Sequence, residues 1–478
     1  KYPDQYFKVT FDAAEGEIIS TYPFAYDKDL GIESLPIVEK EGYLFSGWFL
    51  NGVKVESIPA GTTGELTLVA KWREPFLIVD GTTEEGHYAT LSAALAAAQN
   101  GDIIKLVAGD YNEAVTIKTP NLTIQGPNAG VAGHATNRAA EAVIKSVITV
   151  NAAAKNLVID GLKFTGAAQV TGKSGDYSGF IFQNNLVVDS TLVAAEYKPT
   201  TNYVDSGFIQ FAYSAVNSAT NFAFNNNKFE NVAAENIHVG RNYNLTVDNN
   251  EFYNYTRDCI RIDGGYVYGV LSFTNNKFEN PTVGKGQNAV YFKSYSGKAS
   301  TSTVIIFKGN EFIKCGGLMT NTANSGTIGA WSYQEHGGVI TIEENIFDHC
   351  YNGIYFRNNG QGNSDGPWSC DIKNNIFLGL PTEFYYQSYN GTGDSESTNP
   401  HLAVFAENYY EDNNGQVITD LSKHASLFKH CKSYGTTLTT KPTINVADAV
   451  KFYKVTYELD GGALPSDAPV TFVEGEAV

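Results

Sequence analysis

The chain has 478 residues, enough for a large core and more than one domain. Acidic residues outnumber basic ones and leave a formal net charge of -18, which argues against a nucleic-acid partner because phosphates require a basic surface. The abundant Tyr, Phe, Asn and Gly indicate an extracellular β-protein, the cysteines form no CxxC zinc pattern, and no apolar run is long enough to span a membrane.

Residues from about Tyr6 to Trp72 have the pattern of a small β-domain. Strand-like runs open it at Phe7–Phe11 and close it at Leu66–Trp72. The phrase between them contributes Gly42, Tyr43, Phe45, Gly47 and Trp48, and the closing run contributes Ala70, Lys71 and Trp72. This combination resembles the Listeria–Bacteroides repeat, or internalin B-repeat, a β-grasp-like module of bacterial surface proteins. The resemblance implies a repeat module over residues 1–74 and an extracellular or cell-surface attached bacterial protein.

The next segment has the features of a solenoid cap. The Leu/Ala-rich run after Thr90, a plausible N-cap, predicts a helix over residues 90–99. With the Gly-Asp-x-Ile and Gly-x-Tyr phrases of residues 101–111, it resembles the start of the pectin-lyase-like family of right-handed parallel β-helices. The resemblance implies a β-helix over residues 75–450. It implies no single activity, because that fold hosts lyases, hydrolases, esterases and inert adhesins.

A short phrase recurs between residues 180 and 410. It consists of an apolar residue, two variable residues, Asn, one variable residue and an aromatic or apolar residue. The recurring Asn residues are Asn185, Asn227, Asn250, Asn276, Asn310, Asn345, Asn375 and Asn408. The variable spacing indicates a fixed unit with inserted loops, and the alternating polarity indicates strands. Asn tolerates the left-handed backbone of a sharp bend and can form ladders between stacked coils, so we predict a bend and a ladder at these positions.

These observations predict an all-β protein, a parallel β-helix with a small N-terminal β-grasp-like module; an antiparallel β-sandwich with Asn-rich turns is the alternative. Leu162 takes the place of the ladder Asn in an earlier coil. Cys315 and Cys350 each follow a ladder Asn by five residues, so we expect them to stack in adjacent coils, reduced or as a disulfide.

Beyond Asp420 the repeat fades, and residues 421–450 are expected to form the closing coil. Residues 453–462 repeat the opening of the first module. We therefore interpret residues 451–478 as the truncated start of a second repeat module, and the chain as a fragment of a longer surface protein.

Candidate functional residues lie on the second strand of each coil, where polar residues alternate with apolar ones. One predicted outward column contains Gln210, His238, Arg261, Tyr291, Tyr355 and Tyr385, and a second contains Asp263, Lys293, Arg357 and Gln387. Loops carrying Trp331 and Trp368 flank this sheet. Since Tyr and Trp stack on the apolar faces of sugars, we expect a walled groove that binds polysaccharide through His238, these tyrosines and both tryptophans.

A catalytic alternative uses the same face. A lyase acting on an acidic glycan needs a base and a cation to stabilise the resulting anion, roles open to Arg261, Lys293 or Arg357. Asp263, and with it Asp258, is a candidate calcium ligand. Hydrolysis needs a carboxylate pair, and only Asp263 is placed firmly on the face.

The sequence thus leaves three functional hypotheses. The first is a glycan-binding or adhesive module, acting as a monomer on a polysaccharide or a host or plant glycan. The second is a polysaccharide lyase, with Ca2+ as the conceivable cofactor. The third is a rigid stalk. Exposed charges on a sheet are often no more than solubilising pairs, so none of the three is decided by the sequence.

Overall fold

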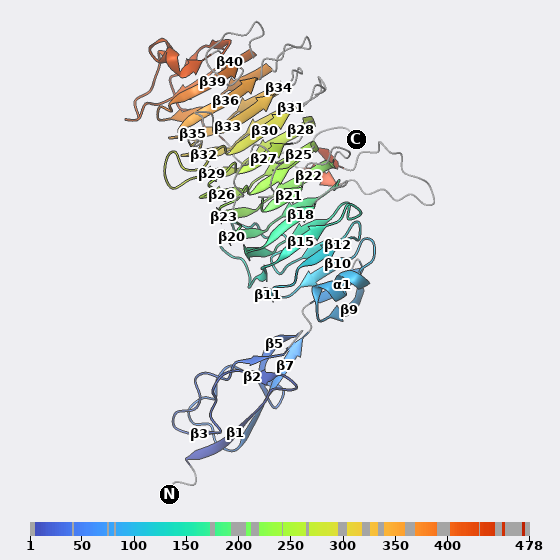
Figure 1. The fold of residues 1–478 in the computed structure, drawn as a ribbon. Coiled ribbons are helices and arrows are strands. Elements are labelled where there is room, and N and C mark those ends of the chain that lie inside the picture. The colour runs from blue at the N-terminus through green and yellow to red at the C-terminus, as the bar shows by residue number, and fades with distance from the viewer. Residues whose placement is uncertain are drawn as a thin grey trace.

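A computed structural model describes residues 5–40, 43–73, 76–80, 83–172, 177–192, 207–211, 219–240, 242–263, 267–294, 304–317, 326–332, 339–358, 369–389, 402–429, 431–444, 452–454 and 471–473. The chain forms a small N-terminal β-module followed by a long parallel β-helix (Figure 1). The predicted all-β solenoid is therefore confirmed and the β-sandwich alternative is wrong. Among the residues that the structure describes, no helix is long and apolar enough to cross a membrane.

The N-terminal module is built on a five-stranded sheet of order β3-β1-β7-β5-β6, with a separate β2–β4 pair. Its strands are β1 (Tyr6–Asp12), β2 (Glu17–Ile18), β3 (Ala25–Asp27), β4 (Val38–Glu39), β5 (Leu44–Leu50), β6 (Val53–Val55) and β7 (Leu66–Arg73). Trp48 is buried in its core, and its indole Nε1 donates to the carbonyl of Pro36 at 2.9 Å. Trp72 likewise donates to Ala13 O at 2.8 Å, so both tryptophans fix loops to the sheet.

Three sheets form the walls of the β-helix. The first contains β8 (Phe76–Asp80), β9 (Thr83–Tyr88), β10 (Ile103–Leu106), β13 (Thr123–Gln125), β16 (Val158–Asp160), β19 (Ile181–Gln183), β22 (Ala219–Asn225), β25 (Asn242–Asp248), β28 (Val267–Thr274), β31 (Val304–Lys308), β34 (Val339–Glu343), β37 (Ser369–Lys373), β40 (Leu402–Ala406) and β43 (Ser433–Tyr434). Its strands from β10 onward are parallel.

The second sheet contains β11 (Gly109–Tyr111), β14 (Ala142–Ile144), β17 (Lys163–Gly166), β20 (Leu186–Ser190), β23 (Lys228–Val232), β26 (Glu251–Tyr253), β29 (Lys277–Glu279), β32 (Glu311–Ile313), β35 (Ile346–Asp348), β38 (Ile376–Leu378), β41 (Asn408–Tyr410) and β44 (Thr437–Leu438). The third contains β12 (Val115–Ile117), β15 (Val147–Val150), β18 (Gln169–Gly172), β21 (Ile209–Phe211), β24 (Ile237–Val239), β27 (Ile260–Asp263), β30 (Val290–Ser294), β33 (Ile328–Ser332), β36 (Asn352–Asn358), β39 (Glu383–Tyr389) and β42 (Phe428–Lys429).

The first coil is closed by a hairpin and a short helix. Strands β8 and β9 pair antiparallel, and β8 covers the free edge of β10. Helix α1 (Leu91–Ala97) begins after Thr90, whose hydroxyl accepts from Ala93 N, and it buries Leu91 and Ala94. The predicted helix and its N-cap are thus confirmed. Its burial removes from water the core that an uncapped solenoid would expose.

The ladder asparagines connect the first and second sheets. From Asn227 to Asn375 each side-chain amide donates to the ladder Asn of the next coil: Asn250 Nδ2 donates to Asn276 Oδ1 at 2.9 Å, and Asn276 Nδ2 donates to Asn310 Oδ1 at 3.0 Å. The ladder is therefore confirmed. The predicted left-handed conformation belongs instead to the residue just before each ladder Asn, namely Asn184, Asn226, Asn249, Asn275, Gly309, Glu344, Asn374 and Glu407. The ladder Asn is left free to face inward.

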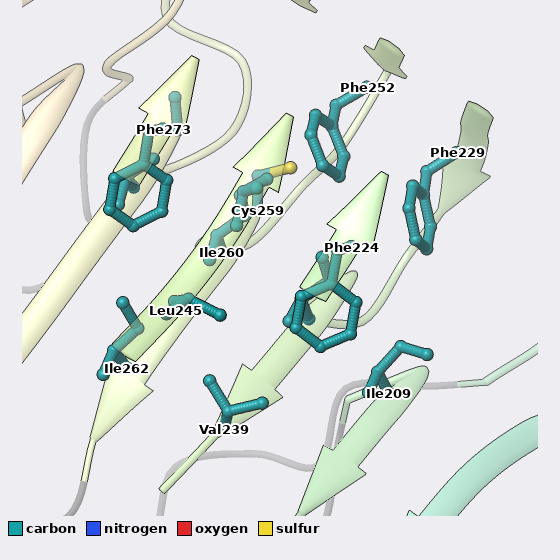
Figure 2. Packing of buried hydrophobic residues seen from close by; sticks show 14 of the residues in the cluster. Ile209, Phe224, Phe229, Val239, Leu245, Phe252, Cys259, Ile260, Ile262 and Phe273 are labelled. Atoms are coloured by element: carbon teal, nitrogen blue, oxygen red, sulfur yellow. The ribbon is translucent and has the colours of Figure 1, made fainter. Parts of the chain in front are cut away.

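Aromatic rings are stacked through the interior beside this ladder. On the second sheet Phe252 lies 5.0 Å from Phe229 and 4.8 Å from Phe278 between ring centroids, in nearly parallel planes. Figure 2 shows Phe229 and Phe252 beside Phe224 and Phe273 of the first sheet. One continuous core results, to which Cys315 and Cys350 also belong. These two thiols lie in adjacent coils, as predicted, since Tyr351 N donates to Cys315 O at 2.8 Å.

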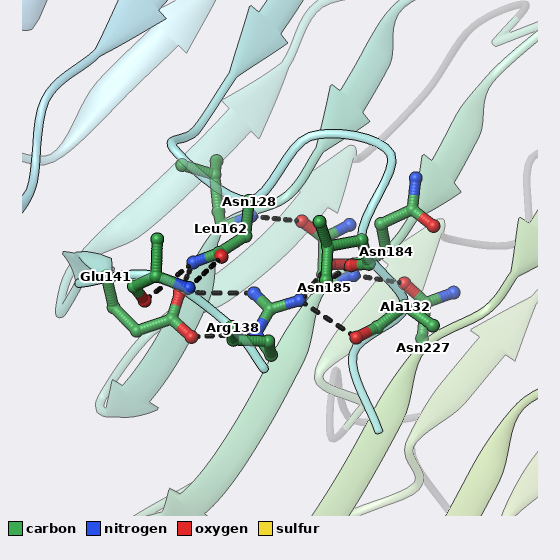
Figure 3. Close-up of polar contacts among 10 residues, drawn as sticks. Asn128, Ala132, Arg138, Glu141, Leu162, Asn184, Asn185 and Asn227 are labelled. Carbon is green, nitrogen blue, oxygen red and sulfur yellow. Dashed lines mark hydrogen bonds and ion pairs between the residues drawn. The ribbon is translucent and has the colours of Figure 1, made fainter. Parts of the chain in front are cut away.

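A long insertion, residues 127–141, runs along the ladder corner and is called the strap below (Figure 3). Its buried Arg138 donates to the carbonyl of Asn184 at 2.9 Å and to Glu141 Oε1 at 2.7 Å. Gly133 N donates to Asn226 O at 2.7 Å, and His134 Nε2 lies 3.2 Å from Asn249 O. The strap therefore binds the backbone of three successive coils.

The far end is closed by the 3₁₀ segment η1 (Leu421–Leu427) and the short strands that follow it. Further along, β45 (Phe452–Lys454) and β46 (Thr471–Val473) pair antiparallel, with Tyr453 opposite Phe472. In the N-terminal module Phe7 lies opposite Tyr26 in the same way. The two hairpins share register and spacing, which accords with the interpretation of residues 451–478 as the start of a repeat.

Candidate functional site

Parallel register aligns one residue from each strand of the third sheet from β21 onward. We call this set the outer column: Gln210, His238, Arg261, Tyr291, Gly329, Tyr355, Tyr386 and Lys429. Neighbouring members are one strand apart, about 4.8 Å. The predicted column is thus brought together, with one exception at its far end.

That exception is Tyr385, which lies in the core with none of its side chain exposed. Strand pairing places Tyr385 opposite Ile354, and Tyr386 opposite Tyr355. The reason lies at the corner that precedes each strand of this sheet, where two consecutive residues face inward, here Phe384 and Tyr385. Strict alternation fails there, so the prediction for Tyr385 is wrong and Tyr386 takes the outward position.

The outer column is less exposed than alternation suggested. Gln210, His238 and Tyr355 are only 3%, 7% and 4% exposed. The residue three positions before a column member folds back over the column. Gly207, before Gln210, donates its N–H to Gln210 Oε1 at 2.8 Å. Gly326, before Gly329, is so close to the next coil that a Cβ on it would lie 2.8 Å from the Cβ of Tyr355. The expectation that these three side chains point to solvent is therefore wrong.

The same fold-back places acidic and amide groups around His238 and Arg261. Glu235 and Asp258 each stand three residues before a column member, and both are buried. Arg261 donates to Asp258 Oδ2 at 3.2 Å, while Asn288 Nδ2 donates to Asp258 Oδ1 at 2.6 Å. The result is a partly desolvated cluster of two carboxylates, one guanidinium and one imidazole.

Burial sets the protonation states in this cluster. Burial, reinforced by the adjacent Arg261 charge and opposed by Glu235, lowers the pKa of His238 to about 4. The imidazole is therefore neutral at pH 7, and its Nδ1 has no hydrogen-bond partner in the described part of the chain. Burial also raises the pKa of Asp258, against the opposing effect of Arg261 and Asn288. Perturbed groups of this kind are enriched at functional sites.

A cation lies at each end of the accessible part of the column, with tyrosine rings and Gly329 between them. The Arg261 guanidinium lies 5.5 Å from the Tyr291 ring centroid, a cation–π distance. Tyr355 and Tyr386 stack at 5.1 Å with their planes 8° apart, and Lys429 Nζ lies 5.1 Å from the Tyr386 ring. Arg261, Tyr291, Tyr386 and Lys429 are partly exposed, so a ligand has access to both charges and rings.

Glycine at position 329 is required by this arrangement. A Cβ there would lie 2.3 Å from Asn288 Oδ1 and 3.2 Å from Tyr291 Cδ2. Gly329 thus leaves room for the Asn288 side chain, whose Oδ1 accepts from Gly326 N at 3.0 Å, and for the Tyr291 ring beside it.

A second column, two residues further along each strand, follows the backbone register. It consists of Asp263, Lys293, Trp331, Arg357 and Ser388. Their side chains lie outside the described part of the structure. Trp331, expected in a loop, is on strand β33 between Lys293 and Arg357. Gln387 pairs with Phe356 instead, so its predicted place in this column is wrong.

Two predicted features fall largely outside the described residues. Trp368 is not described, and neither are most of the loops expected to wall a groove.

Within the described ranges, no three His, Cys, Asp or Glu side chains are grouped so that they could hold a metal ion. Both carboxylate oxygens of Asp258 already accept from Arg261 or Asn288, which makes it a poor calcium ligand. Calcium stays a prediction resting on Asp263.

Sequence reasoning missed Glu235, Asn288, Tyr386 and Lys429. Glu235 and Asn288 could have been found from the sequence, since each lies three residues before a column position and repeats the spacing of Asp258 to Arg261. Lys429 had none, because the repeat fades before β42.

Comparison with known proteins assigns the N-terminal module. Residues 7–71 match the Listeria-Bacteroides repeat domain, which is typical of bacterial surface proteins. No curated protein and no solved structure matches the chain. The predicted repeat is thus confirmed for the first module, and the remainder is defined by its fold as a parallel β-helix. The resemblance to the pectin-lyase-like family stays a prediction.

Proposed function

We propose that this is a surface-attached bacterial protein whose β-helix binds polysaccharide along the outer face of the third sheet. The supporting observation is a set of tyrosine rings that lies between two partly exposed cations, Arg261 and Lys429. Sugar rings offer C–H faces to tyrosine and hydroxyl or anionic groups to Arg and Lys. A continuous face suits a polymer, because successive sugars meet successive coils.

Affinity gel electrophoresis on a panel of acidic and neutral polysaccharides tests this proposal. For the retained glycan, Tyr386→Ala should weaken retention by about tenfold, since a stacked aromatic contributes roughly 1–1.5 kcal/mol. Tyr253→Ala is the matched control, because Tyr253 is a partly exposed tyrosine on the second sheet. Equal loss in both variants, or no retention of any glycan, would contradict the proposal and favour a rigid stalk.

A lyase is the second candidate, favoured by the neutral His238 beside Arg261. In β-elimination a base removes the proton next to the substrate carboxylate, and the glycosidic C–O bond then breaks to leave a C=C bond in one product, while the departing oxygen takes up a proton from the base or from water. A neutral imidazole suits the base role, whereas the permanently charged Arg261 suits stabilisation of the anion. Lys293 and Arg357 could serve as further cations on the same face.

A turnover assay separates binding from cleavage. Unsaturated products formed by the wild type and lost in Arg261→Ala and His238→Gln would establish the lyase. New reducing ends without unsaturation would indicate hydrolysis by carboxylates such as Glu235 and Asp258. Retention without turnover, with and without Ca2+, would leave a binding module.

A further inference from the structure

The strap covers only part of the ladder corner. Its donors bind the backbone carbonyls of Asn184, Asn226 and Asn249 on successive coils, which we call the covered row. These three residues have φ between 52° and 57°. The residues at the same place in the next five coils have φ between 54° and 68°, so the backbone turns in the same way there. Their carbonyls, which we call the uncovered row, belong to Asn275, Gly309, Glu344, Asn374 and Glu407.

The uncovered row repeats the surface on which the strap lies. Behind the covered row Lys228 N donates to Asn185 O at 2.9 Å, and behind the uncovered row Ile346 N donates to Asn310 O at 2.8 Å. The five carbonyls of the uncovered row differ in one respect, since none of them accepts a hydrogen bond from the part of the chain that the structure describes. The same acceptors are thus presented without the donors.

The strap shows what kind of segment fits such a row. Gly133 and His134 are consecutive residues that bind consecutive coils, so the strap runs along the row at this point. A Cβ on Gly133 would lie 2.0 Å from Asn185 O, so the strap backbone lies directly against the corner. With strands about 4.8 Å apart and about 3.3 Å per extended residue, the five carbonyls span about 19 Å, the length of about six residues.

The side chains beside the uncovered row are acidic on balance. Four carboxylates and three ammonium groups lie within two residues of a row member: Glu311, Glu343, Glu344, Glu407, Lys277, Lys308 and Lys373. Each lysine is already paired with a carboxylate, Lys277 with Glu279 and the other two with Glu343. Glu311 and Glu407 form no ion pair with a described residue. The row therefore has negative charge to offer a basic ligand.

We propose that the uncovered row binds an extended, basic segment of a partner protein in the manner in which the strap binds the covered row. Backbone N–H groups and basic side chains of the segment donate to the carbonyls, as Gly133 N and Arg138 do in the strap. A glycine in the segment permits the close approach, and its cationic groups meet Glu311 and Glu407. The surface lies at the ladder corner, so this binding is independent of the outer face of the third sheet.

The strap supplies the probe, an amidated peptide of residues 130–138 with an uncharged fluorophore at its N-terminus. It retains Gly133, His134 and Arg138 and has no acidic residue. Fluorescence anisotropy with the full chain should show saturable binding. The Gly133→Val peptide should bind about tenfold more weakly, because its side chain has no room against the corner. Equal binding of the two peptides, or no saturable binding at millimolar peptide, would overturn the proposal.

Two variants of the full chain locate the site. Glu311→Lys reverses a charge beside the uncovered row and should weaken peptide binding about tenfold, since like charges then face each other. Glu33→Lys makes the same change at an exposed position of the N-terminal module and should leave binding unchanged. Equal weakening in both variants, or none in Glu311→Lys, would overturn the proposal. Thermal melts establish that both are folded.

Sedimentation of the wild type without peptide tests the other occupant, a second copy of the chain. We expect the monomer to persist as the concentration rises. A dimer that the peptide dissociates would show that the row binds a second copy, and would overturn the assignment to a partner protein.

Discussion

The ladder corner and the outer face of the third sheet obey the same coil repeat but use it differently. At the corner nearly every coil presents the same residue in the same environment, a buried Asn bonded to the next Asn. On the outer face the residue type varies along the column, with six residue types among the eight positions from Gln210 to Lys429. Repetition at the corner accounts for stability, while variation on the face is available for recognition. Mutations in the two regions should therefore have separable effects.

The largest effect is expected at the corner. Asn276→Leu preserves volume but removes the donors to Val247 O and Asn310 Oδ1 and the acceptor of Asn250 Nδ2. Buried polar groups left without partners cost about 1–3 kcal/mol each, so we expect the free energy of unfolding to fall by about 4 kcal/mol. Denaturant unfolding measures this loss.

Asn137→Leu is the control, because Asn137 is an exposed residue of the strap. Folded Asn276→Leu should retain glycan as the wild type does. A similar loss of stability in both variants, or selective loss of retention in Asn276→Leu, would break the proposed separation of corner and face.

A smaller loss of stability is expected from mutations where the strap contacts the ladder corner. Arg138→Ala removes the donor to Asn184 O and leaves the half-buried Glu141 carboxylate without its guanidinium. We expect about 3 kcal/mol of destabilisation, because an unpaired buried charge is costly. The double variant Arg138→Ala with Glu141→Ala should recover part of this loss. No recovery would mean that the ion pair is not the stabilising contact.

The smallest effect is a pH dependence on the outer face. The folded pKa of His238, about 4, lies below the ordinary value of 6.5, so the unfolded chain binds a proton that the folded chain excludes. Above pH 6.5 the imidazole is neutral in both states and does not lower the free energy of unfolding. As the pH falls from 6.5 toward 4, the free energy of unfolding decreases by at most about 1.4 kcal/mol per pH unit. The raised pKa of Asp258 acts in the opposite sense.

The pH dependence must therefore be measured as a difference. Denaturant unfolding of the wild type and His238→Gln between pH 7 and 5 isolates the imidazole, with Glu235, Asp258 and Arg261 present in both. We expect the wild type to lose more stability than the variant as the pH falls. Parallel curves would show that His238 is not held neutral.

The sequence predicted the features that repeat. The ladder positions, the Leu162 substitution, the capping helix and the outward column could be found because hydrophobic alternation and Asn spacing are local properties of the chain. Leu162 N donates to Asn185 Oδ1 at 2.9 Å, the same backbone bond that each ladder Asn makes to the next one.

The errors arose where tertiary structure overrides alternation. Tyr385 faces the core because the corner before β39 turns two consecutive side chains inward, which the sequence of β39 alone does not reveal. The burial of Gln210 depends on Gly207, three positions upstream, and that of Tyr355 on Gly326 of the preceding coil. The phase of the Trp331 strand could not be set because its flanking segments differ from those of the other coils.

The strap also constrains the order of folding. His134 binds a carbonyl 115 residues further along the chain, which a ribosome adding 5–20 residues per second reaches after roughly ten seconds. The first coils must therefore stack while the strap is still undocked. Its attachment to Asn184, Asn226 and Asn249 then requires that those coils have formed in correct register. Docking of the strap would thus mark the completion of the N-terminal half of the solenoid during synthesis.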